Sequence, residues 1–312
     1  MTELSKPHSL RRIALFVGRG VLAAVLLILL FQYVSVADVL DSISKARFGC
    51  LAGAFVLMAA NLALQVLKWR YFVRLMNPEV SNTEAVASFM FGMTLGTVTP
   101  GQIGEFGGRV LGHGSLPAGR IIGLTLVDRL QMICVLGTAG IVSVTVLYHF
   151  GPPLTALAVS VFGLAFIYLF FNPQFVIRLI SRLNLNLLKR PVVQDFIEAI
   201  AVFRPRQLLT SLAFSIAFYL VVFFQMYLLL NSFSEVALVD GLLGFAAMMF
   251  LKALVPISLG DLGIREASSV YFYSLRGIAN TTSLSASLLL FVINVLLPSL
   301  LGLIFTPKFK SK

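Results

Sequence analysis

A series of long apolar runs constrains this chain more than any other feature of its sequence. A transmembrane helix needs about 20 predominantly apolar residues. The sequence predicts six spans, at about residues 13–36, 48–72, 121–148, 154–171, 208–230 and 284–305. Because 58% of the 312 residues are hydrophobic and only 12% are charged, a water-soluble fold could not bury this apolar surface. We therefore expect an all-α polytopic membrane protein with a single transmembrane domain over residues 1–312.

The basic residues are placed as in a membrane protein. The formal net charge is +11, and a basic balance of this kind is also found in nucleic-acid-binding proteins. Here, however, Lys and Arg stand in short stretches beside the apolar runs, as in cytoplasmic loops. No nucleic-acid partner is therefore expected. The first run follows Lys6, Arg11 and Arg12 without an A-x-A-type cleavage site, which indicates a retained span rather than a signal peptide.

Residue types that bind metals or cofactors form no pattern in this sequence. Cys50 and Cys134 lie far apart in apolar surroundings, and the three histidines are isolated. These spacings match no disulfide framework or zinc motif, and no nucleotide-binding loop is visible. We expect no metal and no cofactor, so any transport would be driven by a gradient, a coupled ion or downhill flow.

Two short segments, one in each half of the chain, share a pattern. Residues 99–109 are T-P-G-Q-I-G-E-F-G-G-R, and residues 255–265 are V-P-I-S-L-G-D-L-G-I-R. The common pattern P-x-x-x-G-[ED]-[FL]-G-x-R recurs at a constant offset of 156 residues. The matched pairs are Pro100 and Pro256, Gly104 and Gly260, Glu105 and Asp261, Gly107 and Gly263, and Arg109 and Arg265. This agreement predicts an internal duplication, with repeat one at about 48–150 and repeat two at about 207–306.

The two motifs also bear on topology. Each interrupts an apolar stretch with proline and glycine, which end a helix and allow a tight turn. We interpret each as a re-entrant hairpin; an ordinary kink in a spanning helix is the alternative. With about six spans and two hairpins, both termini and the basic residues 172–206 fall on the cytoplasmic side, while Arg265 and Arg276 are exceptions on the outer side. The two repeats are then inverted, as in many transporters.

Residues 172–206 form the only sizeable polar stretch. The apolar residues at helical spacing within it are Phe175, Leu179 and Leu183, followed by Val193, Phe196, Ile197 and Ile200. Apolar stripes beside basic residues indicate amphipathic helices in the headgroup region on the cytoplasmic side. A solvated linker is the alternative.

The hairpin tips are expected to line a cavity. Irregular backbone at membrane depth is tolerated only inside the protein or beside water. The residues that set these tips are Pro100, Gly101, Gly104, Pro256, Ser258, Gly260 and Gly263. Glycines spaced by four, at positions 92, 96, 104, 108 and 112, would also let helices pack closely.

Charged residues in the hairpins are the first candidates for function, because a charge inside the bilayer is costly. Glu105 with Arg109, and Asp261 with Arg265, are spaced i, i+4 and share a helix face. Each pair either braces its hairpin or leaves the arginine to bind the phosphate or carboxylate of a lipid headgroup.

Further polar residues lie in or near the apolar runs. Glu266 is extra in the second repeat and is a candidate to receive a cationic group. Lys252 either contributes to specificity or reaches toward an interface. The others fall in two sets, Asn61, Gln65 and Lys68 on one helix face and Asp128, Arg129 and Gln131 after the first hairpin.

The two motif segments resemble a known family. Residues 100–109, P-G-Q-I-G-E-F-G-G-R, and residues 255–266, V-P-I-S-L-G-D-L-G-I-R-E, are similar to the lysylphosphatidylglycerol synthase transmembrane-region family, also called the flippase-like membrane proteins. The family's second motif looks like P-x-S-x-G-G-x-G-x-R-E. It is matched at Pro256, Ser258, Gly260, Gly263, Arg265 and Glu266. Asp261 departs from it, standing where glycine is usual, and the resemblance covers nearly the whole chain.

The resemblance implies a function in lipid transport. The best-known members fuse this unit to a soluble aminoacyltransferase domain, and there the membrane unit is associated with flipping aminoacylated phosphatidylglycerol. The sequence ends at Lys312 without room for such a domain, so lipid synthesis is not expected and a separate lipid-modifying enzyme is a possible partner.

Taken with the residues, this implies a multi-pass flippase or transporter of the cell (inner or plasma) membrane. Its cargo would be a phospholipid, an aminoacylated lipid or a lipid-linked molecule with an anionic headgroup, and no catalytic residue is expected. Two alternatives stay open. One is a membrane-embedded enzyme that uses Glu105 and Asp261 as acid and base on lipid headgroups. The other is a transporter of small soluble anions.

Overall fold

The computed structural model describes residues 41, 44, 46–99, 101–172, 175, 178, 190–255 and 262–305. Within these residues every regular element is a helix, as the apolar runs predicted. The predicted first span, at about 13–36, lies outside the described residues. So do most of residues 173–189 and the tip of the second predicted hairpin at 256–261.

Four helical segments are long and apolar enough to cross a membrane. They are α3 (Phe48–Met76), α6 (Ala118–Leu147), α11 (Pro205–Phe233) and the C-terminal run Asn280–Phe305. Each coincides with a predicted span. The span predicted at about 154–171 coincides with the apolar helix α7 (Pro152–Phe171), which is not one of these four. The full count of six spans therefore stays a prediction.

The C-terminal run is not a uniform helix. It consists of α14 (Asn280–Phe291), a π-helical turn η1 (Val292–Leu296), α15 (Leu297–Gly302) and a final 3-10 turn η2 (Leu303–Phe305). Pro298 follows the wide turn, and proline has no N–H with which to continue an α-helical ladder. The wider turn is a common way of accommodating such a break.

Two helix pairs stand where the hairpins were predicted. The first joins α4 (Asn82–Thr97) to α5 (Gly104–Leu111), and the second joins α12 (Leu238–Leu254) to α13 (Ile264–Ser274). In the first pair, glycines let the two backbones touch. A Cβ atom added at Gly108 would lie 2.7 Å from Gly92 Cα, and one at Gly104 would lie 2.2 Å from Leu95 O. The predicted close packing of these glycines is therefore present.

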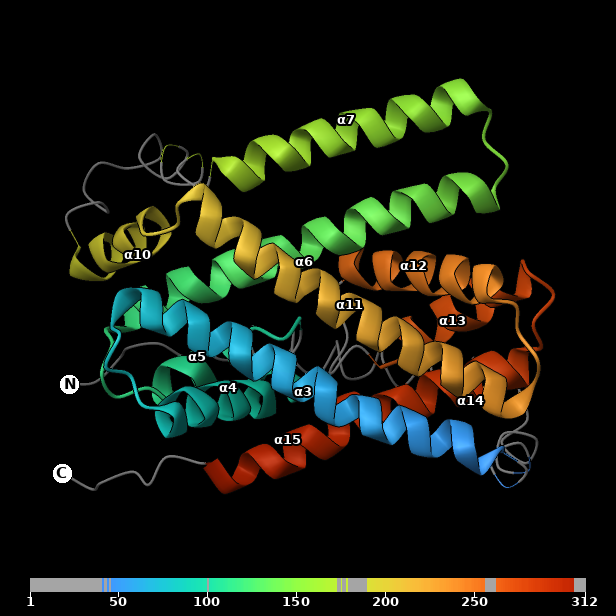
Figure 1. The fold of residues 1–312 in the computed structure, drawn as a ribbon, viewed down its shortest axis with the longest axis horizontal. Coiled ribbons are helices and arrows are strands. Elements are labelled where there is room, and N and C mark those ends of the chain that lie inside the picture. The colour runs from blue at the N-terminus through green and yellow to red at the C-terminus, as the bar shows by residue number, and fades with distance from the viewer. Residues whose placement is uncertain are drawn as a thin grey trace, which may run out of the picture.

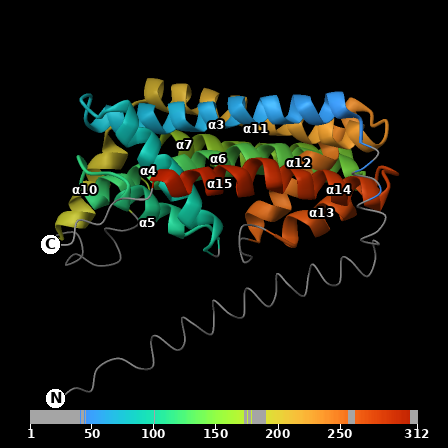
Figure 2. The same ribbon diagram turned by 90° about the horizontal axis from the view of Figure 1, so that it is seen from below.

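The helices of the two halves correspond in order and run in opposite directions. α4 begins at Asn82 and α12 at Leu238, which is the 156-residue offset of the motifs. α3 and α11 pack against each other along the bundle and are antiparallel, and α6 runs opposite to α14 and α15 (Figure 1). The α4–α5 pair lies toward one end of the bundle and the α12–α13 pair toward the other (Figure 2).

The buried apolar residues form two clusters. One centres on α11, α12 and α14 and includes Phe223, Met226 and Phe245. The other joins α3, α4, α6 and α10 (Pro191–Ala201) and includes Trp69 and Phe72. Many large apolar side chains remain outside both clusters, as expected for helices whose outer faces contact lipid.

The short helix α10 packs on the membrane-spanning helix α6. A Cβ atom at Gly119 would lie 2.2 Å from Val192 O, so the two backbones are in direct contact. Arg120 of α6 pairs with Glu198 of α10 at 2.8 Å, beside this seam. Phe196 and Ile200, part of the predicted lipid-facing stripe, pack in the protein core. The interfacial position of residues 172–206 stays a prediction.

Candidate functional site

The first hairpin holds Arg109 in a fully enclosed position. Its residue is 1% exposed, and the guanidinium carbon lies 4.1 Å from the ring centroid of Trp69 and 5.4 Å from that of Phe89. Its nitrogens pair with Glu105, as the i, i+4 spacing predicted, and with Asp128 Oδ2, 3.1 Å from both Nη1 and Nη2. Both terminal nitrogens of Arg109 are therefore engaged by the protein, whereas its buried Nε has no hydrogen-bond partner among the described residues.

Asp128 connects Arg109 to a second buried cation. Lys68 Nζ of α3 lies 2.6 Å from Asp128 Oδ1 of α6 and donates a 2.7 Å hydrogen bond to Ser215 Oγ of α11. Asp128 thus compensates a cation with each of its two oxygens. Three helices that are far apart in sequence, α3, α6 and α11, thus meet around Lys68.

Glu105 likewise connects Arg109 to another cation, Arg129. It pairs with Arg109 and also with Arg129 of α6, which donates a 2.6 Å hydrogen bond to Gln102 Oε1. Gly101 and Gln102 both have positive φ, 59° and 57°, and form the tight turn at the hairpin tip. The contact with Gln102 therefore places Arg129 beside the tip.

We call Lys68, Glu105, Arg109, Asp128 and Arg129 the first-hairpin cluster. Its ion pairs join three cations to two carboxylates. Taking charges out of water is costly unless they are paired. The Arg129 side chain is 34% exposed, against 2% for Arg109 and 8% for Lys68. Arg129 is therefore the cation of this cluster that a ligand reaches most directly.

In the second hairpin, Arg265 pairs with the residue next to it. Arg265 and Glu266 form a buried ion pair, and Glu266 Oε2 also accepts a 2.8 Å hydrogen bond from the N–H of Gly263. Arg265 Nε lies 3.3 Å from Ser287 Oγ, and its guanidinium carbon is 5.1 Å from the Phe291 ring centroid. Gly263 has φ 85°, a conformation that favours glycine. Glu266 thus caps α13 and neutralises Arg265.

The structure separates the predicted site residues into groups. Glu105, Arg109, Arg265 and Glu266 are enclosed and paired with one another or with neighbours. Lys252 is half-buried in the last turn of α12. Gly101, Gly104 and Gly263 shape the ends of the two turns. The remaining predicted residues, Pro100, Pro256, Ser258, Gly260 and Asp261, lie outside the described residues.

Sequence reasoning did not join Lys68, Asp128 and Arg129 to the first hairpin. Each carried the signal of a charged residue in an apolar helix. What the sequence could not show is that α3, α5 and α6 bring them together. Among the described residues, no three His, Cys, Asp or Glu side chains lie close enough to hold a metal ion.

Polar contacts continue along the helix interfaces. Gln131 Nε2 of α6 donates a 2.6 Å hydrogen bond to Ser211 Oγ of α11. Gln225 of α11 and Asn294 of η1 exchange two amide hydrogen bonds, at 3.1 and 2.8 Å. Hydrogen bonds of this kind connect helices in membranes, where water is not available.

Antiparallel apolar helices long enough to cross a bilayer, with an ion cluster enclosed between them, define a polytopic helical membrane protein. The family described as "Lysylphosphatidylglycerol synthase TM region" matches residues 13–302. The chain belongs to this family, as the two motifs implied. A search of curated proteins found no match.

Proposed function

We propose that this protein moves a lipid with an anionic headgroup across the cell membrane. The cargo class is a phospholipid, an aminoacylated lipid or a lipid-linked molecule. Family membership supports a function in lipid handling. The observation that carries the proposal is the position of Arg129, whose side chain is 34% exposed beside the tip of the first hairpin and in contact with the buried ion cluster.

The phosphate or carboxylate of a headgroup is a suitable ligand for a partly exposed arginine. Charge-assisted hydrogen bonds from arginine to such groups are among the stronger polar contacts in proteins. Arg109 cannot offer its two terminal nitrogens without releasing Glu105 or Asp128, and its remaining donor, Nε, is buried. Arg129, at the hairpin tip, is the residue that contacts the headgroup, and Arg109 positions the hairpin.

The antiparallel halves support the second part of the proposal, which is alternating access. Equivalent helices run in opposite directions and the two helix pairs lie toward opposite ends of the bundle (Figures 1 and 2). We infer an inverted repeat whose hairpins enter from opposite faces, with both termini cytoplasmic. Such a pair of halves allows two states, in which one binding site opens to one face of the membrane or to the other. Cargo shifts the populations of the two states when it binds one of them more tightly than the other.

The test is lipid movement in reconstituted vesicles, using fluorescent phosphatidylglycerol and fluorescent phosphatidylcholine. The wild type is expected to move the anionic lipid faster. Arg129→Gln should reduce this preference by about tenfold, the effect of losing one charge-assisted hydrogen bond. Arg276→Gln is the matched control, because its side chain is 33% exposed and also pairs with an acid, Asp240.

Each competing function predicts a different result in the same vesicles. Equal movement of both lipids by wild type and Arg129→Gln would refute a headgroup contact at Arg129. Chemical turnover of the headgroup would identify a membrane-embedded enzyme instead. Uptake of free phosphate without lipid movement would identify a transporter of small anions.

A further inference from the structure

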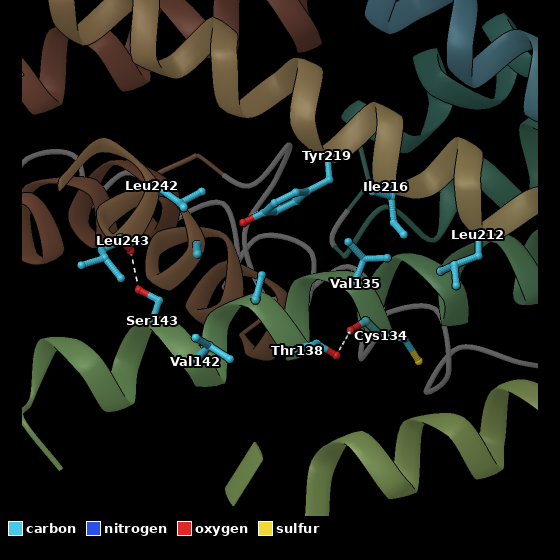
Figure 3. Close-up of a pocket in the computed structure, with 12 residues that line it drawn as sticks. Cys134, Val135, Thr138, Val142, Ser143, Leu212, Ile216, Tyr219, Leu242 and Leu243 are labelled. Atoms are coloured by element: carbon cyan, nitrogen blue, oxygen red, sulfur yellow. Dashed lines mark hydrogen bonds between the residues drawn. The ribbon is translucent and has the colours of Figure 1, made fainter. Parts of the chain in front are cut away.

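A cavity of about 380 Å³ lies between α6, α11 and α12 (Figure 3). Its walls are almost wholly apolar, and the hydroxyls of Thr138 and Ser143 donate to backbone carbonyl oxygens, at 2.9 and 2.5 Å. The Tyr219 hydroxyl is enclosed and has no hydrogen-bond partner among the described residues. Of the described residues that line this cavity none is charged, so it has no group that would select one ligand over another.

A second pocket, of about 250 Å³, has charged residues in its wall. It lies between α3 and α11, and it is lined by Leu67, Arg70, Tyr71 and Arg74 of α3 and by Phe214 of α11. The ring centroids of Tyr71 and Phe214 are 6.4 Å apart, so the two helices are in contact at the pocket. Two arginines and two aromatic rings thus line one concavity.

The two arginines of this pocket are held differently. Nε and Nη2 of Arg74 donate hydrogen bonds to Val80 O, at 3.2 and 3.1 Å, and Nη2 also lies 3.1 Å from Asn82 Oδ1. These contacts fix the guanidinium and leave its Nη1 for another acceptor. Arg70 is half-buried and makes no hydrogen bond or ion pair with any residue that the structure describes. An anion in the pocket would therefore meet one fixed and one unpaired guanidinium.

The pocket lies on the opposite side of α3 from the first-hairpin cluster. Leu67, Arg70 and Arg74 are spaced by three and four residues and share one helix face. At 3.6 residues per turn, Arg70 is about 200° around the helix from Lys68, which belongs to the cluster. α3 and α11 pack together on one outer face of the bundle (Figure 2). The pocket therefore opens toward the surrounding lipid and not toward the cluster.

Its position along α3 corresponds to the headgroup layer. With 29 residues α3 is about 43 Å long, whereas the hydrocarbon core of a bilayer is about 30 Å thick. Arg74 is in the last turn of α3 and Arg70 is one turn earlier, so both can reach the headgroups. Leu67, 44% exposed, is one turn deeper. Cations beside an exposed apolar side chain suit a phospholipid better than a soluble anion.

The two arginines have no counterpart in the second half of the chain. At the 156-residue offset of the motifs, their positions correspond to Met226 and Leu230 of α11. Both of these side chains are fully buried in the apolar core. A helix of this kind therefore packs in the bundle without the arginines, and their presence in α3 calls for another reason.

We propose that this pocket binds the phosphate of an anionic phospholipid that stays at the surface of the bundle and is not carried across it. Arg70 and Nη1 of Arg74 donate to the phosphate oxygens, and an apolar chain lies along Leu67 and Phe214. Because α3 and α11 belong to different predicted repeats, the bound lipid joins the two halves at the end for which we infer a cytoplasmic position. The site does not depend on the proposed function, whose headgroup contact is Arg129.

The test uses dioctanoyl phosphatidylglycerol with a photoactivatable diazirine in its headgroup, added to the purified protein in neutral detergent micelles. Labelling is measured at residues 210–218 of α11, so that substitutions in α3 leave the labelled segment unchanged. Arg70→Gln and Arg74→Gln should each weaken the apparent affinity by about tenfold, the effect of one charge-assisted hydrogen bond. Arg206→Gln is the matched control, because Arg206 is exposed at the start of α11 and does not line the pocket. It should leave the affinity unchanged.

Competing ligands separate the possible sources of the phosphate. Unlabelled dioctanoyl phosphatidylglycerol should displace the probe at least about tenfold more effectively than dioctanoyl phosphatidylcholine or inorganic phosphate. Equal displacement by inorganic phosphate would identify a site for soluble anions and overturn the proposal. Labelling with unchanged affinity in both Arg70→Gln and Arg74→Gln would overturn it as well.

A stability measurement tests whether the lipid joins the two helices. In an Arg129→Gln background, which lacks the headgroup contact of the proposed function, phosphatidylglycerol should still raise the denaturant concentration at which the protein unfolds. Adding Arg70→Gln and Arg74→Gln should abolish this shift, and a persistent shift would refute the joining of α3 to α11. Failure of the proposed function has a separate signature, because Arg129→Gln would then leave lipid movement unchanged while labelling at 210–218 persisted.

Discussion

Asp128→Asn removes the carboxylate on which the first-hairpin cluster depends. Asp128 lies 2.6 Å from Lys68 and 3.1 Å from Arg109, so each of its oxygens compensates one buried cation. Asparagine preserves the shape and one hydrogen-bond acceptor but not the charge. Arg109 would keep Glu105, whereas Lys68 would keep the Ser215 hydroxyl and the Phe72 ring but no anion among its described partners.

The expected cost follows from this arrangement. Removing one partner of a buried ion pair typically costs about 3–5 kcal/mol, because the remaining charge stays buried and unpaired. The Asp128 side chain is 21% exposed, which allows some screening of the charges left behind. We therefore expect a loss at the low end of that range, about 3 kcal/mol of unfolding free energy.

The assay is unfolding of the purified protein in mixed micelles by a denaturing detergent. Lys68→Met alone should also destabilise, but adding it to Asp128→Asn should restore balance, so the double variant should be at least about 1 kcal/mol more stable than additivity predicts. Asp240→Asn is the matched control. Asp240 is 25% exposed and pairs with Arg276, so its loss should cost less than about 1 kcal/mol.

Two results would refute the reasoning. One is an Asp128→Asn protein that unfolds at the same denaturant concentration as wild type. The other is strict additivity of the Lys68 and Asp128 substitutions, which would mean that the two charges do not interact in the folded protein.

Three further predictions concern the hairpin, a loop and the topology. Gly108→Ala should destabilise the protein, because the added Cβ would lie 2.7 Å from Gly92 Cα. Gly107 is the control on the same helix, because a Cβ added there has no atom within 4 Å. In the same unfolding assay, Gly107→Ala should be neutral or stabilising by up to about 1 kcal/mol. Burial alone would raise the pKa of the Glu84 carboxyl, but two loop N–H groups and His113 lower this pKa below its ordinary value of 4.5. The ionised Glu84 should therefore stabilise the fold above pH 4.5, and this stabilisation should be lost as the pH falls. Glu84→Gln should remove this part of a pH–stability curve. A cysteine at position 181, in a background without the two native cysteines, should resist an impermeant thiol reagent in intact cells, and strong labelling would contradict the cytoplasmic placement of residues 172–206.

Local sequence determined much of the architecture. Long apolar runs required helices that cross a bilayer, and four described segments have that length and composition. Gly101, with φ 59°, lies in the turn between α4 and α5, as the motif predicted, because glycine readily adopts a positive φ. The pairing of Glu105 with Arg109 followed from helical spacing alone.

The second hairpin shows a contact that helical spacing did not indicate. Arg265 was expected to pair four residues back with Asp261, which lies outside the described residues. In the structure Arg265 pairs with its neighbour Glu266, which at the same time caps α13. A capping carboxylate is held by the backbone at the start of the helix, and that position brings it within reach of the adjacent arginine.

Only the tertiary structure decided which arginine is accessible. By sequence, Arg109 is the motif residue and Arg129 is one of several polar residues in the following span. Packing of Trp69 and Phe89 around Arg109 encloses it, while Arg129 stays at the hairpin tip. The physical reason is that enclosure depends on contacts between helices distant in the chain. Periodicity describes one helix at a time and contains no information about which neighbour covers which face.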